Sequence, residues 1–78
     1  MRTVERLDAL LDAARQHGYE VRYEYLGGTG GGRCEFKGRK WLFIDLAWNA
    51  IETLEMVEAT MDKDPAFAIS QAIQKNAA

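Results

Sequence analysis

The sequence predicts an α+β fold with the element order α-β-β-β-α-α, in which helices pack on a three-stranded antiparallel sheet. Three observations predict this architecture: apolar residues at helical spacing near the N-terminus, a strict alternation of apolar and charged residues after them, and a dense apolar run behind a glycine-rich loop. A chain of 78 residues has room for one domain, so we expect residues 1–78 to fold as a unit.

The first helix is predicted between Val4 and His17. Thr3 can cap its N-terminus, and Gly18 can take the left-handed conformation that commonly follows the end of a helix. The apolar residues that fall on one stripe of this helix are Val4, Leu7, Leu10, Leu11 and Ala14. We expect this stripe to pack against the sheet.

Three strands are predicted after this helix. The first covers Tyr19–Tyr25, because apolar residues at odd positions alternate with charged residues at even positions. The second covers residues 33–37 and the third residues 40–46, joined by a tight hairpin turn at Gly38. Since strands connected by short loops usually pair as neighbours, we expect the sheet to be antiparallel.

The third strand is apolar on both faces. Trp41 and Phe43 point one way, whereas Leu42, Ile44 and Leu46 point the other way. A strand of this kind is normally covered on both sides. The helices that follow and precede the sheet need only one of these faces, so we expect another segment or a second molecule to shield Trp41 and Phe43.

Two more helices are predicted after the strands. Asn49 followed by Glu52 resembles a capping box, so a helix should extend from this cap to Met61. The pair Asp64-Pro65 is a typical helix start, with Asp as the N-cap and Pro at the first helical position. The third helix should cover residues 65–74, and its apolar residues are Phe67, Ile69 and Ile73.

Composition and charge argue against several functional classes. The formal net charge is −2 and the isoelectric point is about 5.3, whereas a nucleic-acid-binding domain usually carries a basic surface. No apolar stretch reaches the roughly 18 residues of a membrane span, and the N-terminus does not resemble a signal peptide. We therefore expect a cytoplasmic protein that binds neither a membrane nor a nucleic acid.

The glycine-rich loop is the most unusual feature of the chain. Five of the seven glycines lie between Gly27 and Gly32. Successive glycines can present backbone N–H groups to an anion, but phosphate-binding loops lead into a helix, and this loop leads from one strand to another. One hypothesis is a flexible connection, and the other is a ligand site. The candidate ligand-binding residues are Gly28, Gly30, Gly31, Gly32, Arg33 and Cys34.

Cys34 is the only cysteine, so no disulfide can form within the chain. It shares its strand face with Phe36, and we expect it to lie in the core as a small apolar residue. The alternative is a catalytic nucleophile, but its base would have to be His17, the only histidine. We therefore predict no catalytic residues.

The sequence also predicts no metal site. One histidine and one cysteine are too few for a four-ligand zinc site. Glu55, Glu58 and Asp62 fall on one side of the second helix and could gather a hard cation, but such an acidic stripe is typical of a solvated helix face.

Parts of the chain resemble known families. The block Leu26–Cys34, followed by Gly38-Arg39-Lys40, residues 42–46 and residues 52–61, resembles a family of small uncharacterised bacterial proteins. This resemblance covers residues 18–61 and implies no function. The strand ending in Ile44-Asp45-Leu46, with the helix after it, is also similar in topology to small zinc peptidases with an anti-repressor role. Those peptidases carry His-Glu-x-x-His on that helix, whereas residues 54–58 here read Leu-Glu-Met-Val-Glu, so peptidase activity is not implied.

Together these observations predict a small non-enzymatic protein-interaction module. It would bind either a second copy of itself, as a homodimer, or a different protein. The expected interface residues are Trp41, Phe43, Trp48 and Phe67. The alternative hypothesis is a binder of anions or small ligands that uses the glycine-rich loop with Arg33. Neither hypothesis calls for a cofactor.

Overall fold

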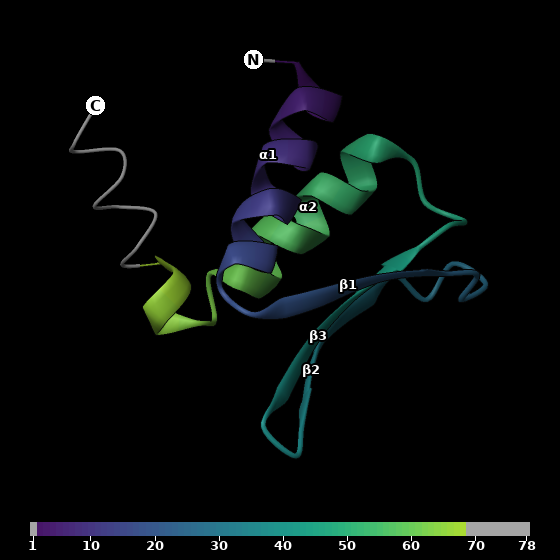
Figure 1. The fold of residues 1–78 in the computed structure, drawn as a ribbon. Coiled ribbons are helices and arrows are strands. Elements are labelled where there is room, and N and C mark those ends of the chain that lie inside the picture. The colour runs from purple at the N-terminus through teal and green to yellow at the C-terminus, as the bar shows by residue number, and fades with distance from the viewer. Residues whose placement is uncertain (1, 69–78) are drawn as a thin grey trace.

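The computed structural model describes residues 2–68, and they form an α+β fold (Figure 1). Residues 65–68 begin a further helical turn, and the rest of the predicted third helix lies outside the described residues. The elements in chain order are α1 (Thr3–Gln16), β1 (Tyr19–Glu24), β2 (Gly31–Phe36), β3 (Arg39–Asp45) and α2 (Ala50–Met61).

The three strands form a mixed sheet in the order β1-β3-β2. β2 and β3 form the predicted antiparallel hairpin, whereas β1 pairs with β3 in parallel. The prediction of a purely antiparallel sheet is therefore wrong. The physical reason is the glycine-rich loop, which carries the chain from the end of β1 across the end of β3 and starts β2 on the far side of β3, instead of folding β2 back beside β1.

The β2–β3 hairpin is closed by the two residues Lys37 and Gly38, between the paired residues Phe36 and Arg39. Their φ angles are 51° and 78°. Two consecutive left-handed residues are the signature of a type I′ turn, whose twist matches that of the strands it joins. The local sequence thus sets the hairpin register.

The two helices begin and end close to the predicted positions. The capping box of α2 is confirmed, because Asn49 Oδ1 accepts from the Glu52 N–H at 2.8 Å and Glu52 Oε1 accepts from the Asn49 N–H at 3.1 Å. The N-cap of α1 is Arg2, without a side-chain cap bond, so the prediction of Thr3 as the cap is wrong. After α1, Gly18 has a φ of 87° and turns the chain into β1.

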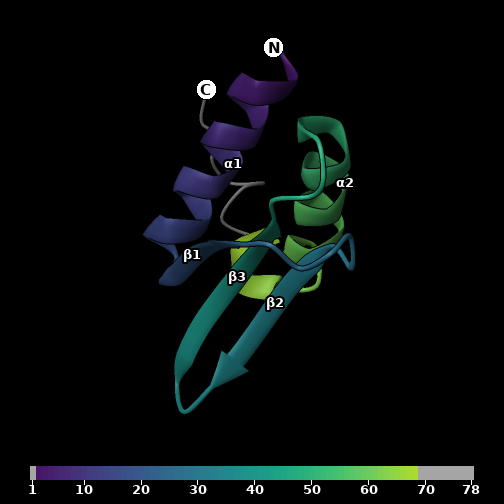
Figure 2. The same ribbon diagram turned by 90° about the vertical axis from the view of Figure 1, so that its right-hand side faces the viewer.

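Both helices lie on the same side of the sheet (Figures 1 and 2). Their apolar residues pack on the face of the sheet that carries Tyr19, Leu42 and Ile44, and we call this the covered face. The core consists of these three residues together with Leu11, Ala14, Val57, Met61 and Phe67.

Within residues 2–68 no helix lies on the opposite side, which we call the open face. The strand register places its residues, which are Glu20, Arg22 and Glu24 on β1, Gly32, Cys34 and Phe36 on β2, and Arg39, Trp41, Phe43 and the buried Asp45 on β3. Among the same residues, neither helix is both long enough and apolar enough to cross a membrane.

Candidate functional site

The glycine-rich loop is organised around a buried carboxylate at the end of β3. Asp45 is only 1% exposed. Its two carboxylate oxygens accept from the backbone N–H groups of Leu26 at 3.2 Å, Gly30 at 2.9 Å and Ala47 at 2.9 Å. Burial alone would raise the pKa of Asp45, but the N–H donors of Gly30, Ala47 and Leu26 outweigh burial and lower that pKa below its ordinary value.

These hydrogen bonds limit the capacity of the loop to bind an external anion. Backbone N–H groups of a glycine-rich loop are suited to an anion, and here the N–H of Gly30 and that of Leu26, just before the loop, already bind an anion that belongs to the chain itself. Trp48 completes the arrangement, because its indole Nε1–H donates to the Gly28 carbonyl at 3.1 Å. The loop is therefore fastened to the chain that follows β3.

Two of the glycines are required by close approach. Gly30 is buried with a φ of 100°, and a Cβ there would lie 2.6 Å from Cη2 of Trp48. Gly31 has a φ of 75°, and a Cβ there would overlap the carbonyl group of Phe43. Both positions combine a left-handed backbone with no space for a side chain, so only glycine fits.

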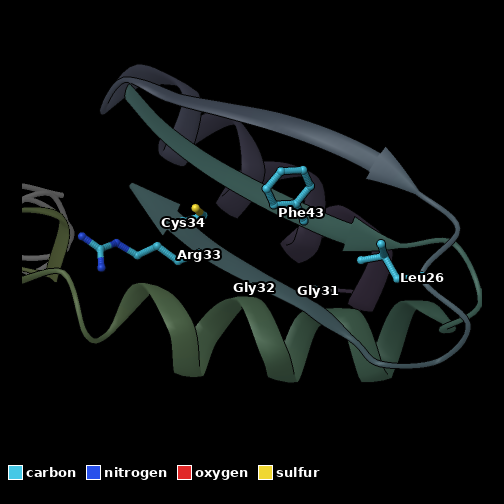
Figure 3. A pocket seen from close by; sticks show the side chains of 6 residues that line it. All are labelled: Leu26, Gly31, Gly32, Arg33, Cys34 and Phe43. Carbon is cyan, nitrogen blue, oxygen red and sulfur yellow. The ribbon is translucent and has the colours of Figure 1, made fainter. Parts of the chain in front are cut away.

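A shallow hollow of about 360 Å³ opens beside the start of β2 (Figure 3). It is lined by Leu26, Gly31, Gly32, Arg33, Cys34 and Phe43. Four of the six candidate ligand residues thus meet at one place, whereas Gly28 and Gly30 contact Trp48 and Asp45 instead. The hollow is largely apolar because Gly32 has no side chain and Leu26 and Phe43 supply its walls.

The exposed thiol of Cys34 corrects the prediction that this residue lies in the core. Cys34 pairs with Trp41 and shares a face with Phe36, as the alternation of β2 requires, but this face is the open one. His17 lies on the covered side against the ring of Phe67, with the ring centroids 5.2 Å apart. The thiol and the imidazole therefore lie on opposite sides of the sheet and do not form a nucleophile and base pair.

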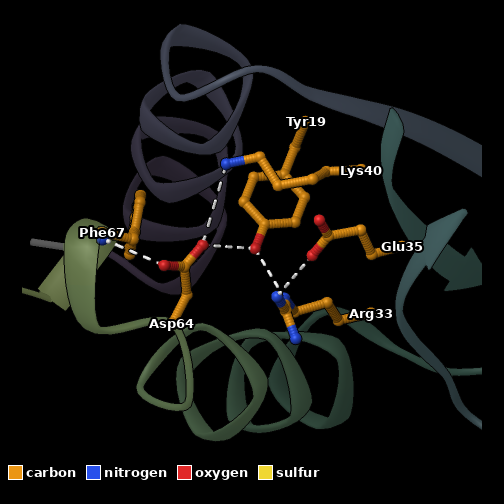
Figure 4. Close-up of polar contacts among 6 residues, drawn as sticks. All are labelled: Tyr19, Arg33, Glu35, Lys40, Asp64 and Phe67. Carbon is orange, nitrogen blue, oxygen red and sulfur yellow. Dashed lines mark hydrogen bonds and ion pairs between the residues drawn. The ribbon is translucent and has the colours of Figure 1, made fainter. Parts of the chain in front are cut away.

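Arg33 extends away from the hollow and joins a polar cluster on the covered face (Figure 4). Its Nε–H donates to the Tyr19 hydroxyl at 2.7 Å, and that hydroxyl donates to Asp64 Oδ2 at 2.5 Å. Lys40 Nζ lies 3.9 Å from the same carboxylate oxygen, and the N–H of Phe67 donates to Asp64 Oδ1 at 3.4 Å. The cluster ties the helical turn after Asp64, for which the sequence correctly predicts an N-cap, to the sheet.

The cluster shifts the pKa values of its members. The Tyr19 hydroxyl lowers the pKa of Asp64, burial opposes that effect, and further help from the Phe67 N–H and from Lys40 leaves the pKa of Asp64 below its ordinary value. Burial, together with the bond to Asp64, raises the pKa of the Tyr19 hydroxyl. The alternation of β2 separates Arg33 from Gly32 and Cys34, and the pairing of both β1 and β2 with β3 then places Arg33 on the same face as Tyr19.

The lowered pKa values of Asp45 and Asp64 predict an acid-sensitive fold. A carboxyl group whose pKa is lower in the folded state stabilises that state above its unfolded pKa, about 4, and the stabilisation is lost as the pH falls through the folded pKa. We expect the free energy of unfolding, measured by urea titration, to be level from about pH 7 to pH 5 and to fall below about pH 4.

Tyr19→Phe removes the hydroxyl that lowers the pKa of Asp64, so this variant should be less stable at neutral pH but lose less stability on acidification. Stability that rises between pH 5 and pH 3 in the unsubstituted chain would contradict the assignment.

Two aromatic side chains form the centre of the open face. The rings of Trp41 and Phe43 stack with their centroids 6.3 Å apart and their planes 13° from parallel. The Arg22 guanidinium lies 5.8 Å from the Trp41 ring centroid, a distance typical of a cation–π contact. Both aromatic residues remain half-buried, and Phe36 near the hairpin turn is 64% exposed.

The four candidate interface residues separate into two groups. Trp41 and Phe43 lie on the open face, as an interface would require. Trp48 is half-buried against the glycine-rich loop, and Phe67 is only 3% exposed in the core. Phe36 was not among the predicted interface residues, although its position beside the hairpin turn indicates that its side chain is exposed.

Comparisons of the chain with known protein families, with curated protein sequences and with solved structures found no match.

Proposed function

We propose that this chain is a small non-enzymatic protein-interaction module whose contact surface is the open face of the sheet. The observation that carries the proposal is the presence of Trp41, Phe43 and Phe36 on a face that no helix covers within residues 2–68. Aromatic side chains contribute much of the binding energy at protein interfaces, because they bury a large area with few rotatable bonds. An exposed apolar patch with charged neighbours is typical of such a surface.

The charges around the aromatic residues fit a protein partner. Glu20 and Glu24 lie on the β1 side of the open face, while Arg22 lies between them over Trp41. A surface of mixed sign surrounding an apolar centre matches the usual arrangement of a protein interface, with an apolar core and a polar rim. A nucleic-acid surface would instead carry a continuous basic stripe.

The hypothesis of an anion-binding loop receives less support. Such a site needs free N–H donors and a cationic side chain that both face the position of the bound anion. The N–H groups of Gly30 and of Leu26, just before the loop, are bonded to Asp45, and Arg33 is bonded to Tyr19 on the other side of the sheet. The contact-surface hypothesis uses the aromatic side chains of the open face, whose apolar area is not bound to any helix within residues 2–68.

Site-specific photocrosslinking tests the proposal. A benzophenone amino acid replaces Phe43 on the open face, and a matched chain carries it at Ile51, a 58% exposed apolar residue on α2. In cells of the source organism, we expect discrete adducts from position 43, reduced when Trp41→Ala is added, and none of the same mass from position 51. Equal adducts from both positions, or none from position 43, would overturn the proposal.

A further inference from the structure

We infer that two copies of this chain bind each other along their β2 edges, through antiparallel pairing of β2 with β2 of the other copy. The two sheets then form one sheet of six strands, with a two-fold axis through the Cys34 pair. This inference rests on the proposed function, because it names one partner of the interaction module. It follows from three features of β2: its edge, which is unpaired within residues 2–68, the order of its charged residues, and the exposed ring of Phe36 with the hollow beside Gly32.

β2 is an edge strand. It pairs only with β3, so its outer N–H and C=O groups lack a strand partner within residues 2–68. Five of its six residues are exposed, and it contains no proline. An edge of this kind is a template for pairing with another strand.

The charges of β2 select one register. A two-fold axis perpendicular to the sheet keeps the helices of both copies on the same side, and it must pass through a pair of identical residues. Arg33 and Glu35 already form an ion pair at 3.3 Å within one chain, and centred on Cys34 the pairing places each of them opposite the other's equivalent in the second copy, so that all four charges alternate in sign. Centred on Arg33 or on Glu35, it places identical charges opposite each other, which is destabilising.

The same register places the exposed ring of Phe36 of one copy beside the hollow of the other copy. Gly32 of one copy lies opposite Phe36 of the other, and both belong to the open face. Phe36 is 64% exposed in the single chain, and the hollow of about 360 Å³ lies beside Gly32 between Leu26 and Phe43 (Figure 3). An aromatic residue opposite a glycine compensates for the packing that the glycine lacks. The two-fold axis makes this contact twice.

The β1 edge lacks this combination of features. It also offers opposite charges, at Glu20 and Arg22, but the hollow that can receive an aromatic ring lies at the β2 edge. After pairing through β2, the Trp41 and Phe43 pairs of both copies lie on one continuous face. The dimer therefore enlarges the contact surface proposed above.

Oxidation of Cys34 tests the register directly. Directly opposite residues in antiparallel strands have Cα atoms about 4.5–5.5 Å apart, within the range that a disulfide spans. Diamide takes up the two electrons and two protons that two thiols release on forming a disulfide. We expect diamide to convert the chain to a disulfide-linked dimer. A control chain with Cys34→Ser and Glu20→Cys, whose cysteine lies on β1, should stay monomeric under the same conditions.

Interface variants test the contacts. Sedimentation from about 10 µM to about 1 mM should detect the dimer, and Phe36→Ser and Glu35→Arg should each weaken it at least about tenfold. Ile51→Ser, at an apolar position on α2 that is 58% exposed, should leave the dimer unchanged. Mixing Glu35→Arg with Arg33→Glu places opposite charges at both contacts again and should restore a dimer. If Arg33→Glu unfolds through loss of its Tyr19 bond, the other two variants still decide the matter.

A chain that stays monomeric up to about 1 mM, or a dimer that neither Phe36→Ser nor Glu35→Arg weakens, would overturn the inference. Adducts from position 43 to a different protein, formed by a monomeric chain, would overturn the dimer and leave the proposed function intact.

Discussion

Replacing Gly31 with alanine is expected to abolish folding. Gly31 starts β2 with a φ of 75°, and the added Cβ would overlap the carbonyl group of Phe43 in the central strand. Neither atom belongs to a flexible side chain, so relief requires separating β2 from β3. A domain of this size has a stability of only about 3–5 kcal/mol, and the loss of this strand pairing exceeds that margin.

Gly27→Ala is the matched control for this change. Gly27 has a similar φ of 66°, but an added Cβ would have nothing within 4 Å. Its expected cost is the backbone strain alone, about 1–2 kcal/mol. Circular dichroism and urea unfolding should therefore find Gly27→Ala folded but weakened and Gly31→Ala unfolded. Similar losses in the two variants would show that the backbone conformation, and not the overlap with β3, makes Gly31 necessary.

Asp45→Asn is expected to produce the second-largest loss of stability. The substitution keeps the shape of the side chain but replaces one acceptor oxygen with an NH2 group. The N–H donors of Leu26, Gly30 and Ala47 then share a single neutral acceptor, and at least one buried donor loses its partner. We expect the Tm to fall by roughly 10 °C or more, with the glycine-rich loop exchanging its amide hydrogens faster.

Asp12→Asn serves as the control, because the Asp12 side chain is 68% exposed and, within residues 2–68, bonds only to Arg15, three residues further along α1. Its Tm should change by less than about 3 °C. If the two variants melt together, the loop is held by its packing on Trp48 and not by the Asp45 carboxylate.

These two positions also explain why the glycine-rich loop exists. β1 and β2 lie on either side of β3, so the connection between them must cross the end of β3 within a few residues. This crossing buries Gly30 against the Trp48 ring. It also turns the Gly30 N–H inward, where the Asp45 carboxylate accepts its hydrogen bond. The loop therefore resembles an anion-binding loop in its chemistry, but the anion that it binds is the carboxylate of Asp45 in the same chain.

Features that depend on neighbouring residues could be predicted from the sequence. The capping box of Asn49 and Glu52, the helix-ending Gly18 and the hairpin turn at Lys37-Gly38 each follow from bonds and φ angles within a few residues. The α+β class, the number of strands and the alternation of each strand were predictable for the same reason. Trp41 and Phe43 were correctly placed on one face of β3 because side chains alternate along any strand.

Features that depend on how the strands assemble could not be predicted in this way. The alternation of β2 assigns Cys34 and Arg33 to opposite faces, but it does not say which face receives the helices. The strand order decided that, and with it the exposure of Cys34 and the bond of Arg33 to Tyr19 and Asp64. Contacts between residues 15 to 45 positions apart arise only when β1 and β2 take their places on either side of β3, because hydrophobic patterning specifies which side chains share a face and not which strands become neighbours.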